Sequence, residues 1–259
     1  PLPVPTGGTM PVIRHPSQFE SHSESGWVSQ AWAGAEVFGE PVPMTVRRHR
    51  LEPAAGSAQI PLGGQEAFVY VTAGLGAARV AGETFPLARE SVLWLAGCSG
   101  LDLEAGPDGL DVLVAESAAS SAVAPRPLRK LLTAADLPHL VSTRDTRDRL
   151  DLVTDDVPVG ATLIRADRIR YNPGDTAAAH YHTDCHHVFC VLAGSGLLYA
   201  DEHGYRLTAG DSALVGPGEV HWFENDTPED FSFVEFWAPR PTQTIWTVTG
   251  DVCTWAPAD

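Results

Sequence analysis

The sequence contains one pattern of short apolar stretches twice, and this repeat is what most limits the fold. Runs rich in Val, Leu, Phe, Tyr and Trp alternate with Gly, Pro and Asp, first in EAFVYVTAG, ESVLWLAG and LDVLVAES and again in HVFCVLAG, DSALVGPGEVHWF and FSFVEFWAP. Such runs are typical of strands in a β-sandwich or barrel. A shift of 120 residues superimposes the two sets, with the matched pairs Pro53 and Pro173, Gly74 and Gly194, Leu87 and Leu207, and Val114 and Val234. The match needs no gap from Gly74 to Glu116, so we predict an internal duplication and two related domains in an all-β chain.

Changes in composition suggest where these domains begin and end. We expect an N-terminal extension over residues 1–40, a first domain over 41–118, a connector over 119–160, and a second domain with a C-terminal extension over 161–259. The connector includes the Ala/Ser-rich SAASSAVAPRP and the charged RDTRDRLDLVTDD. Helix-like periodicity occurs in PLRKLLTAADLPHLV, residues 127–141, so the connector is predicted to be partly helical.

The charge and the cysteine content limit the partners and the compartment. The chain has 17 Lys and Arg against 33 Asp and Glu, a formal net charge of −16, and such an acidic protein repels nucleic acids and anionic membranes. The four cysteines form no CxxC pair, and the first residues lack the basic and apolar segments of a secretion signal. No apolar run reaches the roughly 18 residues of a membrane helix. We therefore expect a cytoplasmic protein whose partner is a small-molecule substrate.

Four histidines lie close together in HYHTDCHH, residues 180–187. Neutral imidazole is the commonest metal ligand near pH 7, although histidines of a polar loop before a strand would give the same composition. The shift of 120 residues favours a metal site, because it replaces histidines by apolar residues at four separate places. The pairs are His180 and Ile60, His182 and Leu62, His187 and Ala67, and His221 and Leu101. Apolar replacements indicate positions that point inward in both copies, so we expect metal in the second copy only.

Two segments of the second copy resemble the two signature motifs of the cupin superfamily. The first motif is matched in GDTAAAHYHTDCHHVFCVLAG by Gly174, His180, His182 and Gly194. The second is matched in GDSALVGPGEVHWFEN by Gly210, Gly218, His221 and Asn225, with the proline displaced by one position to Pro217. Together with the duplication, the resemblance implies a bicupin with two jelly-roll (double-stranded β-helix) domains, of which the first is degenerate. Alternate residues of a strand share a face, so both histidines of HYH could reach one ion.

The sequence departs from the cupin pattern where the family usually has a glutamate. The family spacing falls on His187 when it is counted back from the last glycine of the first motif, and on His186 when it is counted forward from His182. Neighbouring strand residues point to opposite faces, so only one of the two should bind; we favour His187, with His186 as the alternative. The resemblance then implies one divalent ion on His180, His182, His187 and His221. Iron or nickel is favoured, and zinc, manganese or copper would also suit imidazole ligands.

Five further residues are candidates for the site. Glu235 in FSFVEFWAP is the candidate general base, although a carboxylate there could also lie on a solvated face. Arg168 and Arg170 could hold an anionic substrate, although such arginines more often form surface pairs. Tyr199 and Phe223 could line the substrate pocket, although aromatic residues in strands usually belong to the core.

The resemblance implies three classes of function. The first is a metal-dependent dioxygenase acting on a small enolisable or hydroxyketone-type substrate that chelates the metal. The second is a non-redox zinc or manganese enzyme, such as an isomerase, cyclase, lyase or aminohydrolase. The third is a cupin that binds a small molecule without catalysis. We favour the first class, and the resemblance to cupins also implies pairing into a homodimer.

Overall fold

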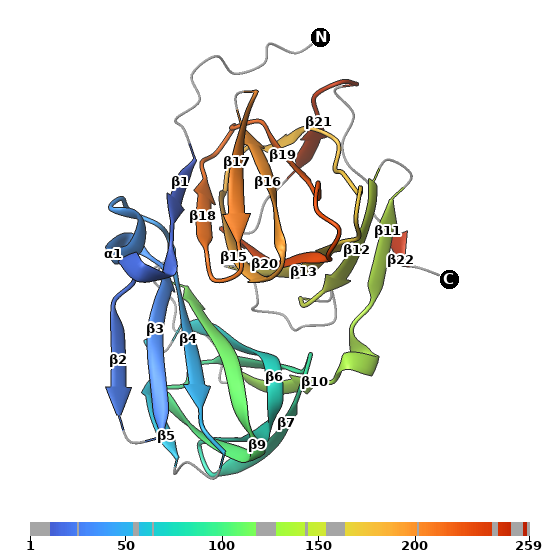
Figure 1. The fold of residues 1–259 in the computed structure, drawn as a ribbon. Helices are drawn as coiled ribbons and strands as arrows, with labels where there is room; N and C mark the ends of the chain where they lie inside the picture. The colour runs from blue at the N-terminus through green and yellow to red at the C-terminus, as the bar shows by residue number, and fades with distance from the viewer. Residues whose placement is uncertain are drawn as a thin grey trace. The chain divides into compact units, whose positions relative to one another are not determined.

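The computed structural model describes residues 11–24, 26–53, 57–63, 65–117, 128–142, 145–153, 164–200, 202–239, 243–249 and 256–257 (Figure 1). The chain divides into two compact units. The first domain comprises residues 18–137 and 155–164, and the second comprises residues 1–17, 138–154 and 165–259. Within the described residues both are built from antiparallel strands, so the all-β prediction is confirmed. No helix in this part of the chain is long and apolar enough to span a membrane.

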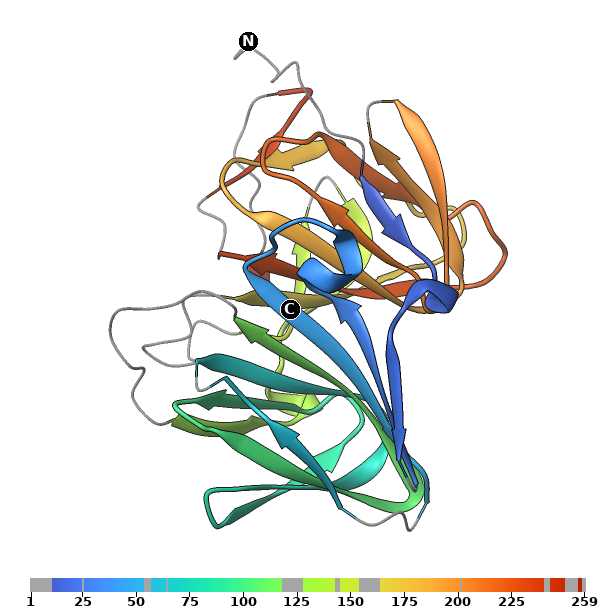
Figure 2. The ribbon, with the colours of Figure 1, turned by 90° about the vertical axis from the view of Figure 1, so that its left-hand side faces the viewer.

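The first domain has nine strands in its described part, joined in one sheet. They are β2 (Ser21–Glu24), β3 (Trp27–Ala33), β4 (Met44–Leu51), β5 (Ala58–Pro61), β6 (Glu66–Val80), β7 (Glu83–Ala88), β8 (Val92–Ala96), β9 (Gly100–Ser117) and β10 (Leu128–Leu132). The order is β10-β8-β6-β9-β4-β3-β2, with β5 paired to β9 and β7 paired to β6. Figure 2 shows β2, β3 and β4 side by side in blue along this domain. The short helices α1 (Ala35–Phe38) and η2 (Ala134–Asp136) complete it.

The second domain folds into two sheets. Its strands are β1 (Val12–Arg14), β11 (His139–Ser142), β12 (Asp145–Asp151), β13 (Arg165–Tyr171), β14 (His180–His182), β15 (His186–Ala193), β16 (Ser195–Ala200), β17 (His203–Thr208), β18 (Ser212–Val215), β19 (His221–Glu224), β20 (Phe231–Ala238), β21 (Thr244–Trp246) and β22 (Ala256–Pro257). One sheet has the order β1-β18-β15-β20-β13-β12-β11-β22 and the other β17-β16-β19-β14-β21. A 3-10 turn, η1 (Pro16–Gln18), follows β1.

Each long strand of the first domain corresponds to two strands of the second. β6 corresponds to β15 and β16, and β9 corresponds to β19 and β20. Gly74 and Gly194 occupy the same place in the two copies, with φ of 82° and 73°. A Cβ atom would lie 2.2 Å from the carbonyl oxygen of Gly109 in the first copy and 2.0 Å from that of Asp230 in the second. Two strands approach so closely here that only glycine fits, which explains why the repeat keeps this residue.

Strand pairing corrects the ungapped alignment of the two copies by one residue. Val69 and Phe189 are equivalent under the shift of 120, yet Val69 is paired with Val114 and Phe189 with Glu235 rather than Val234. β19 still obeys the shift of 120, so the second copy has one extra residue between β19 and β20. A connection can absorb an extra residue, whereas a slip within a strand would turn its buried side chains outward.

The helix predicted within the connector is wrong for most of its length. Leu128–Leu132 form β10, which pairs with β8 along its whole length, and His139–Ser142 form β11. Only Ala134–Asp136 make a single 3-10 turn, in which the carboxylate of Asp136 accepts from the backbone N–H and the hydroxyl of Thr133. The edge of β8 offers backbone hydrogen-bond partners that are distant in the sequence, and such pairing outweighs a local periodicity.

The expected extension over residues 1–40 contributes strands to both domains. β1 pairs with β18 in the second domain, and β2 and β3 pair with each other and with β4 in the first. The charged RDTRDRLD of the expected connector forms β12, which pairs with β13 inside the second domain. Cys98, Cys185 and Cys190 form no disulfide within the described part of the chain, and Cys253 lies outside the described residues.

Candidate metal centre

Three strands of the second domain bring four histidines together in its interior. His180 and His182 lie on β14, His187 on β15 and His221 on β19, and each exposes at most 3% of its surface. His180 lies directly opposite His221. Residues two apart on a strand share a face, so HYH places both of its imidazoles beside His221. The ring centres of His180 and His221 are 4.6 Å apart, and those of His182 and His187 are 4.7 Å apart.

Backbone carbonyl groups fix the orientation of two of the imidazoles. Nδ1–H of His180 donates to the carbonyl oxygen of Ala178 over 2.8 Å, and Nδ1–H of His221 donates to that of Glu219 over 3.0 Å. A carbonyl oxygen can only accept, so Nε2 of both rings carries a lone pair. His180, His182 and His221 offer ligand atoms that all lie within 4.8 Å of one another. These three residues could therefore hold a divalent metal ion.

His182 is held between two side chains. Trp237 donates its Nε1–H to Nε2 of His182 over 3.1 Å, and Nδ1 of His182 lies 2.9 Å from the hydroxyl of Thr244. Because Nε2 accepts, Nδ1 carries the proton and donates it to Thr244. His182 thus has the same tautomer as His180 and His221. Its Nε2 lone pair becomes available to a metal ion when the Trp237 indole moves away from it.

His187 lies among these histidines, and His186 does not. Nδ1 of His187 is 3.1 Å from Nε2 of His221, and its ring stacks on Trp237 with a centre distance of 4.6 Å. Its own Nε2 is buried and makes no hydrogen bond. His186 is half-buried and, as the next residue of β15, points to the opposite face. His187 is not one of the three residues whose ligand atoms lie within 4.8 Å of one another.

Burial keeps all four histidines neutral. Burial lowers the pKa of His180, His182 and His187 well below the usual value of an imidazole, and neighbouring histidines and Arg147 lower it further. Burial also lowers the pKa of His221 to about 4, although the carbonyl of Glu219 opposes the shift. Neutral imidazole is the form that binds metals.

Glu235 is buried beside His187. It lies on β20 and is 1% exposed, opposite Phe189 of β15. Its Oε2 lies 3.2 Å from Nε2 of His187, but the two atoms are not aligned for a hydrogen bond. Burial raises the pKa of Glu235, against the opposing effect of Arg147 and Arg149. A buried carboxyl group with a raised pKa suits a group that exchanges protons.

Four more buried charged residues and the half-buried Arg165 lie on the face of the sheet that carries Glu235. Arg147, Arg149 and Asp151 alternate along β12, and Arg165 and Asp167 alternate along β13, with Asp167 directly opposite Glu235. Arg149 forms an ion pair with Asp167 over 2.6 Å, and Arg165 forms one with Asp151 over 3.0 Å. Burial and the neighbouring Asp167 raise the pKa of Asp151. The interior therefore holds charged side chains as well as histidines, with Arg149 and Arg165 balanced by Asp167 and Asp151.

Sequence reasoning missed Arg147, Arg149 and Asp151, because it assigned RDTRDRLD to the connector. The signal that could have found them is the period of two in Arg147, Arg149 and Asp151, which puts all three on one face of a strand. In a sequence, charged residues at alternate positions normally indicate an exposed strand face. Only the structure shows that the charged face of β12 points inward.

Three of the four predicted pocket residues lie away from the histidines. Arg168 and Arg170 are on the opposite face of β13 from Asp167, and both pair with Asp148, over 2.8 and 3.5 Å. Tyr199 stacks on Trp222 and donates its hydroxyl to Glu224 over 3.1 Å. Phe223 is fully buried in the apolar core of the domain. The structure thus does not bring the two arginines and Tyr199 to the histidines, because each is one residue out of phase with the inner face.

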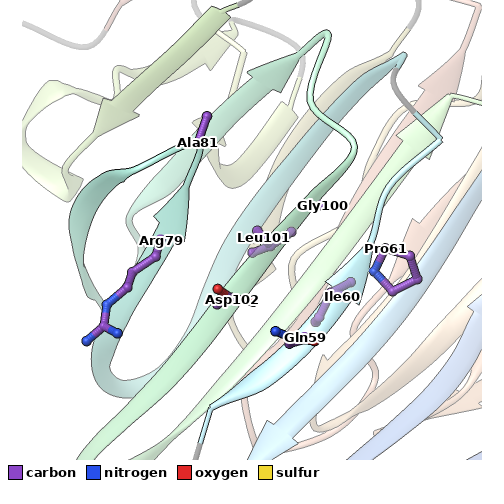
Figure 3. Close-up of a pocket in the computed structure, with 8 residues that line it drawn as sticks. All are labelled: Gln59, Ile60, Pro61, Arg79, Ala81, Gly100, Leu101 and Asp102. Carbon is purple, nitrogen blue, oxygen red and sulfur yellow. The ribbon is translucent and has the colours of Figure 1, made fainter.

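The first domain has apolar side chains where the second has histidines. Ile60 of β5 lies directly opposite Leu101 of β9, as His180 lies opposite His221. Ile60 and Leu101 line a cavity of about 450 Å³ on this domain, and Figure 3 labels both among its lining residues. Both side chains are buried, so the positions point inward in both copies, as the sequence predicted.

Comparisons with known proteins agree with this architecture. The cupin domain family matches residues 167–237, and no curated protein sequence matches the chain. A structure of oxalate decarboxylase from Bacillus subtilis at pH 4.6 is similar with a TM-score of 0.73 and 12% identity, over 94% of this chain and 79% of that one. A structure from work on the Mn(II) centres of the same Bacillus subtilis enzyme gives a TM-score of 0.71 and 12% identity, over 94% and 80%. A further oxalate decarboxylase structure, from a study of its substrate binding mode, gives 0.76 and 11%, over 94% and 80%.

Identities this low establish the fold and leave the activity open. The match to the cupin domain covers the strands that carry His180, His182, His187 and His221. The structural match extends over both domains. The chain is therefore a bicupin in fold, with a cupin domain at residues 167–237.

Proposed function

We propose that the second domain is the metal-dependent catalytic domain of a cupin enzyme. His180, His182 and His221 would hold one divalent ion, with His187 as a fourth ligand. The observation that carries the proposal is the tautomer of the imidazoles: the carbonyl groups that accept from Nδ1 of His180 and His221 leave a lone pair on both Nε2 atoms, and that of His221 faces Nδ1 of His187 over 3.1 Å. Hydrogen bonds of this kind orient the histidine ligands of metal sites.

The side chains around the histidines would carry out the remaining steps. When bound, a divalent ion would polarise oxygen atoms of the substrate, and iron or nickel would also permit chemistry with O2. Glu235, with its raised pKa, would accept a proton from the substrate and return it. Arg147 and Arg149 would attract an anionic substrate and stabilise its enolate form. Trp237 and Trp246, which pack against the histidines, would exclude water.

The reaction that we favour is oxygenation of a small enolisable or hydroxyketone-type substrate. Four neutral imidazoles leave the ion its full positive charge, which favours binding of a substrate through two oxygen atoms. Arg147 and Arg149 are buried on the face that carries Glu235, and Arg149, which is paired with Asp167, would exchange that partner for the enolate. Glu235 is the carboxylate close enough to His187 to act beside the bound substrate.

The second candidate is a manganese-dependent decarboxylase for a small carboxylic acid. It is favoured by the structural neighbours, which are named oxalate decarboxylases, one of them studied for its Mn(II) centres. In this reaction Arg147 and Arg149 would bind the carboxylate, and Glu235 would return a proton to the carbon that loses CO2.

Metal analysis combined with two activity assays tests both candidates. Metal would be measured by mass spectrometry in the tag-free protein, in the His180→Ala/His221→Ala variant, and in the His203→Ala variant as a control, because His203 is exposed on β17. Stoichiometric iron or nickel with O2 consumption on hydroxyketones would support the oxygenase. Manganese with release of CO2 from oxalate, without net O2 consumption, would support the decarboxylase.

Other outcomes would contradict the proposal. If the double variant kept as much metal as the wild type, the histidines would not be the ligands. Stoichiometric metal without turnover of either substrate class would favour the non-catalytic binding protein. The cytoplasmic location and the homodimer stay predictions, and gel filtration tests the latter.

A further inference from the structure

The first domain has a cavity of its own on the side where the second domain carries its histidines. The cavity measures about 370 Å³. Its walls include Ile60 and Val114, which take the places of His180 and Glu235 in the second domain. The first domain therefore has a space where the second has a histidine and a carboxylate, and a volume of this size is within the range of small-molecule sites.

A buried histidine without hydrogen bonds forms part of this cavity. His49 of β4 is 3% exposed, and neither of its ring nitrogens has a hydrogen-bond partner. Burial lowers the pKa of His49 to about 4, so the ring is neutral at pH 7 and offers one donor and one acceptor. Leaving each unsatisfied costs about 1–3 kcal/mol. The second domain has Ile169 at this position, so the common fold does not require a polar residue here.

The outer part of the cavity carries one charge of each sign. Arg47 of β4 is exposed and Glu116 of β9 is half-buried, and both line the cavity. Arg47 lies 3.6 Å from the exposed Glu36, a contact that water screens, and Glu116 accepts a hydrogen bond from the backbone of Gly63. Arg47 and Glu116 form no ion pair with each other among the described residues, so the two charges could each meet a ligand.

His49 and the charged Arg47 lie within reach of the two ends of one small ligand. Arg47 and His49 are two residues apart on β4 and share a face, which separates them by roughly 7 Å along the strand. Trp27, whose ring stacks on that of His49 with a centre distance of 5.8 Å, forms an apolar wall with Ile60 and Val114. A ligand that fits needs opposite charges at one end, a short apolar stem, and a neutral polar tip.

We propose that this cavity binds a free α-amino acid with an uncharged polar side chain, such as glutamine. Arg47 binds its carboxylate, Glu116 its ammonium group, and His49 the amide at the end of the side chain. The methylene groups pack against Trp27, Ile60 and Val114. This inference is independent of the activity of the second domain and gives the degenerate domain a binding function.

Calorimetric titration of the full chain with L-glutamine tests the proposal. We expect saturable binding at one site per chain. Glutaramate, which lacks the ammonium group, and L-norleucine, which lacks the amide, should each bind about ten- to a hundredfold more weakly, because each loses hydrogen bonds to a charged or buried partner. No saturable binding of glutamine, or equal binding of all three probes, would overturn the proposal.

Variants of the charged residues separate the site from general charge effects. Arg47→Gln and Glu116→Gln should each weaken glutamine binding about ten- to a hundredfold. Arg79→Gln and Glu104→Gln, which remove the members of an exposed ion pair in the same domain, should change it less than about twofold. His49→Phe should remove the preference for glutamine over norleucine. Equal losses in the control variants would contradict the assignment.

An amino acid could also chelate a metal ion, so the second domain needs its own control. The His180→Ala/His221→Ala variant should bind glutamine as tightly as the wild type. Loss of binding in that variant would assign glutamine to the histidines of the second domain and would overturn the proposal.

Discussion

The buried histidines of the two domains differ in whether the surrounding chain forms hydrogen bonds with the imidazole ring. His180 and His221 each donate Nδ1–H to a carbonyl oxygen, which fixes the ring and its tautomer. His49 is equally buried but has no hydrogen bond on either nitrogen. An oriented lone pair suits a metal ion, whereas an unsatisfied donor and acceptor suit a ligand that offers both. Burial alone would not have separated these two kinds of histidine.

The four inner histidines predict how substitutions change metal affinity. His221→Ala should weaken the binding of zinc, used as a probe ion, by at least about 100-fold, since removal of a mere supporting partner already costs 10- to 100-fold. His186→Ala should leave it unchanged, because His186 points to the other face of β15. Competition with a chromophoric chelator measures both. A large loss of zinc affinity in His186→Ala, with none in His187→Ala, would mean that His186 and not His187 is a metal ligand.

The buried His49 predicts a loss of stability in mild acid. Its pKa is about 4 in the folded chain and near 6.5 when exposed, so the unfolded state takes up a proton first as the pH falls. Its contribution is fully present above pH 6.5 and is lost as the pH falls toward 4. Between pH 7 and pH 5 the loss is about 2 kcal/mol. Urea unfolding should show that His49→Phe loses that much less stability than the wild type over this range; parallel losses would contradict the assignment.

At the scale of strands, the sequence predicted the strands that belong to a known motif or that pair with a strand close by in the sequence. HYH, HHVFCVLA and HWFE form β14, β15 and β19; alternation allowed only one of His186 and His187 inside, the spacing to Gly194 favoured His187, and His187 is the buried one. The same alternation was overlooked in RDTRDRLD, which forms β12, because charged residues on an inner face have no apolar pattern. PLRKLL has helical spacing but becomes β10, since its partner β8 lies far away in the sequence. Pairing with a distant edge cannot be read from a local period.

The close approach of two strands at Gly194 predicts a large cost for any side chain there. In Gly194→Ala the Cβ atom would lie 2.0 Å from the carbonyl oxygen of Asp230, so the strands must separate, and we expect a loss of more than about 3 kcal/mol. Gly174→Ala is the matched control: its φ is 84°, but nothing lies within 4 Å of a Cβ atom. It should cost only about 1–2 kcal/mol of backbone strain. Urea unfolding of the two variants at pH 7 compares them, and equal losses would refute the steric argument.

For the whole molecule, the duplication was the strongest prediction, and the bicupin fold confirms it. The sequence also identified which copy lost its histidines, because Ile60 and Leu101 occupy the inner positions of His180 and His221. It could not reveal what replaced them. His49 and Arg47 belong to a strand that carries no metal ligand in either copy, so no motif marked them. Their importance depends on a cavity, which exists only after the strands have paired.

Metal binding predicts a gain in stability for the full chain. An ion that binds only the folded state, present at 100 times its Kd, adds about 2.7 kcal/mol, which raises the Tm by roughly 5–10 °C for a chain of this size. Calorimetry of the protein with zinc and with EDTA measures the difference. The His180→Ala/His221→Ala variant should show no shift. A shift of equal size in that variant would place the ion outside the four histidines.

The extra residue between β19 and β20 has a consequence for how such a protein can diversify. In the first copy the inner residues of the corresponding strand include Val112 and Val114; in the second they are Phe233 and Glu235. These pairs occupy the same inner places, so the connection absorbed the extra residue and the same alternate residues of the strand stayed inside. The length of a connection and the lining of a barrel can therefore change independently, and a buried acid such as Glu235 is gained or lost by substitution at a single inner position.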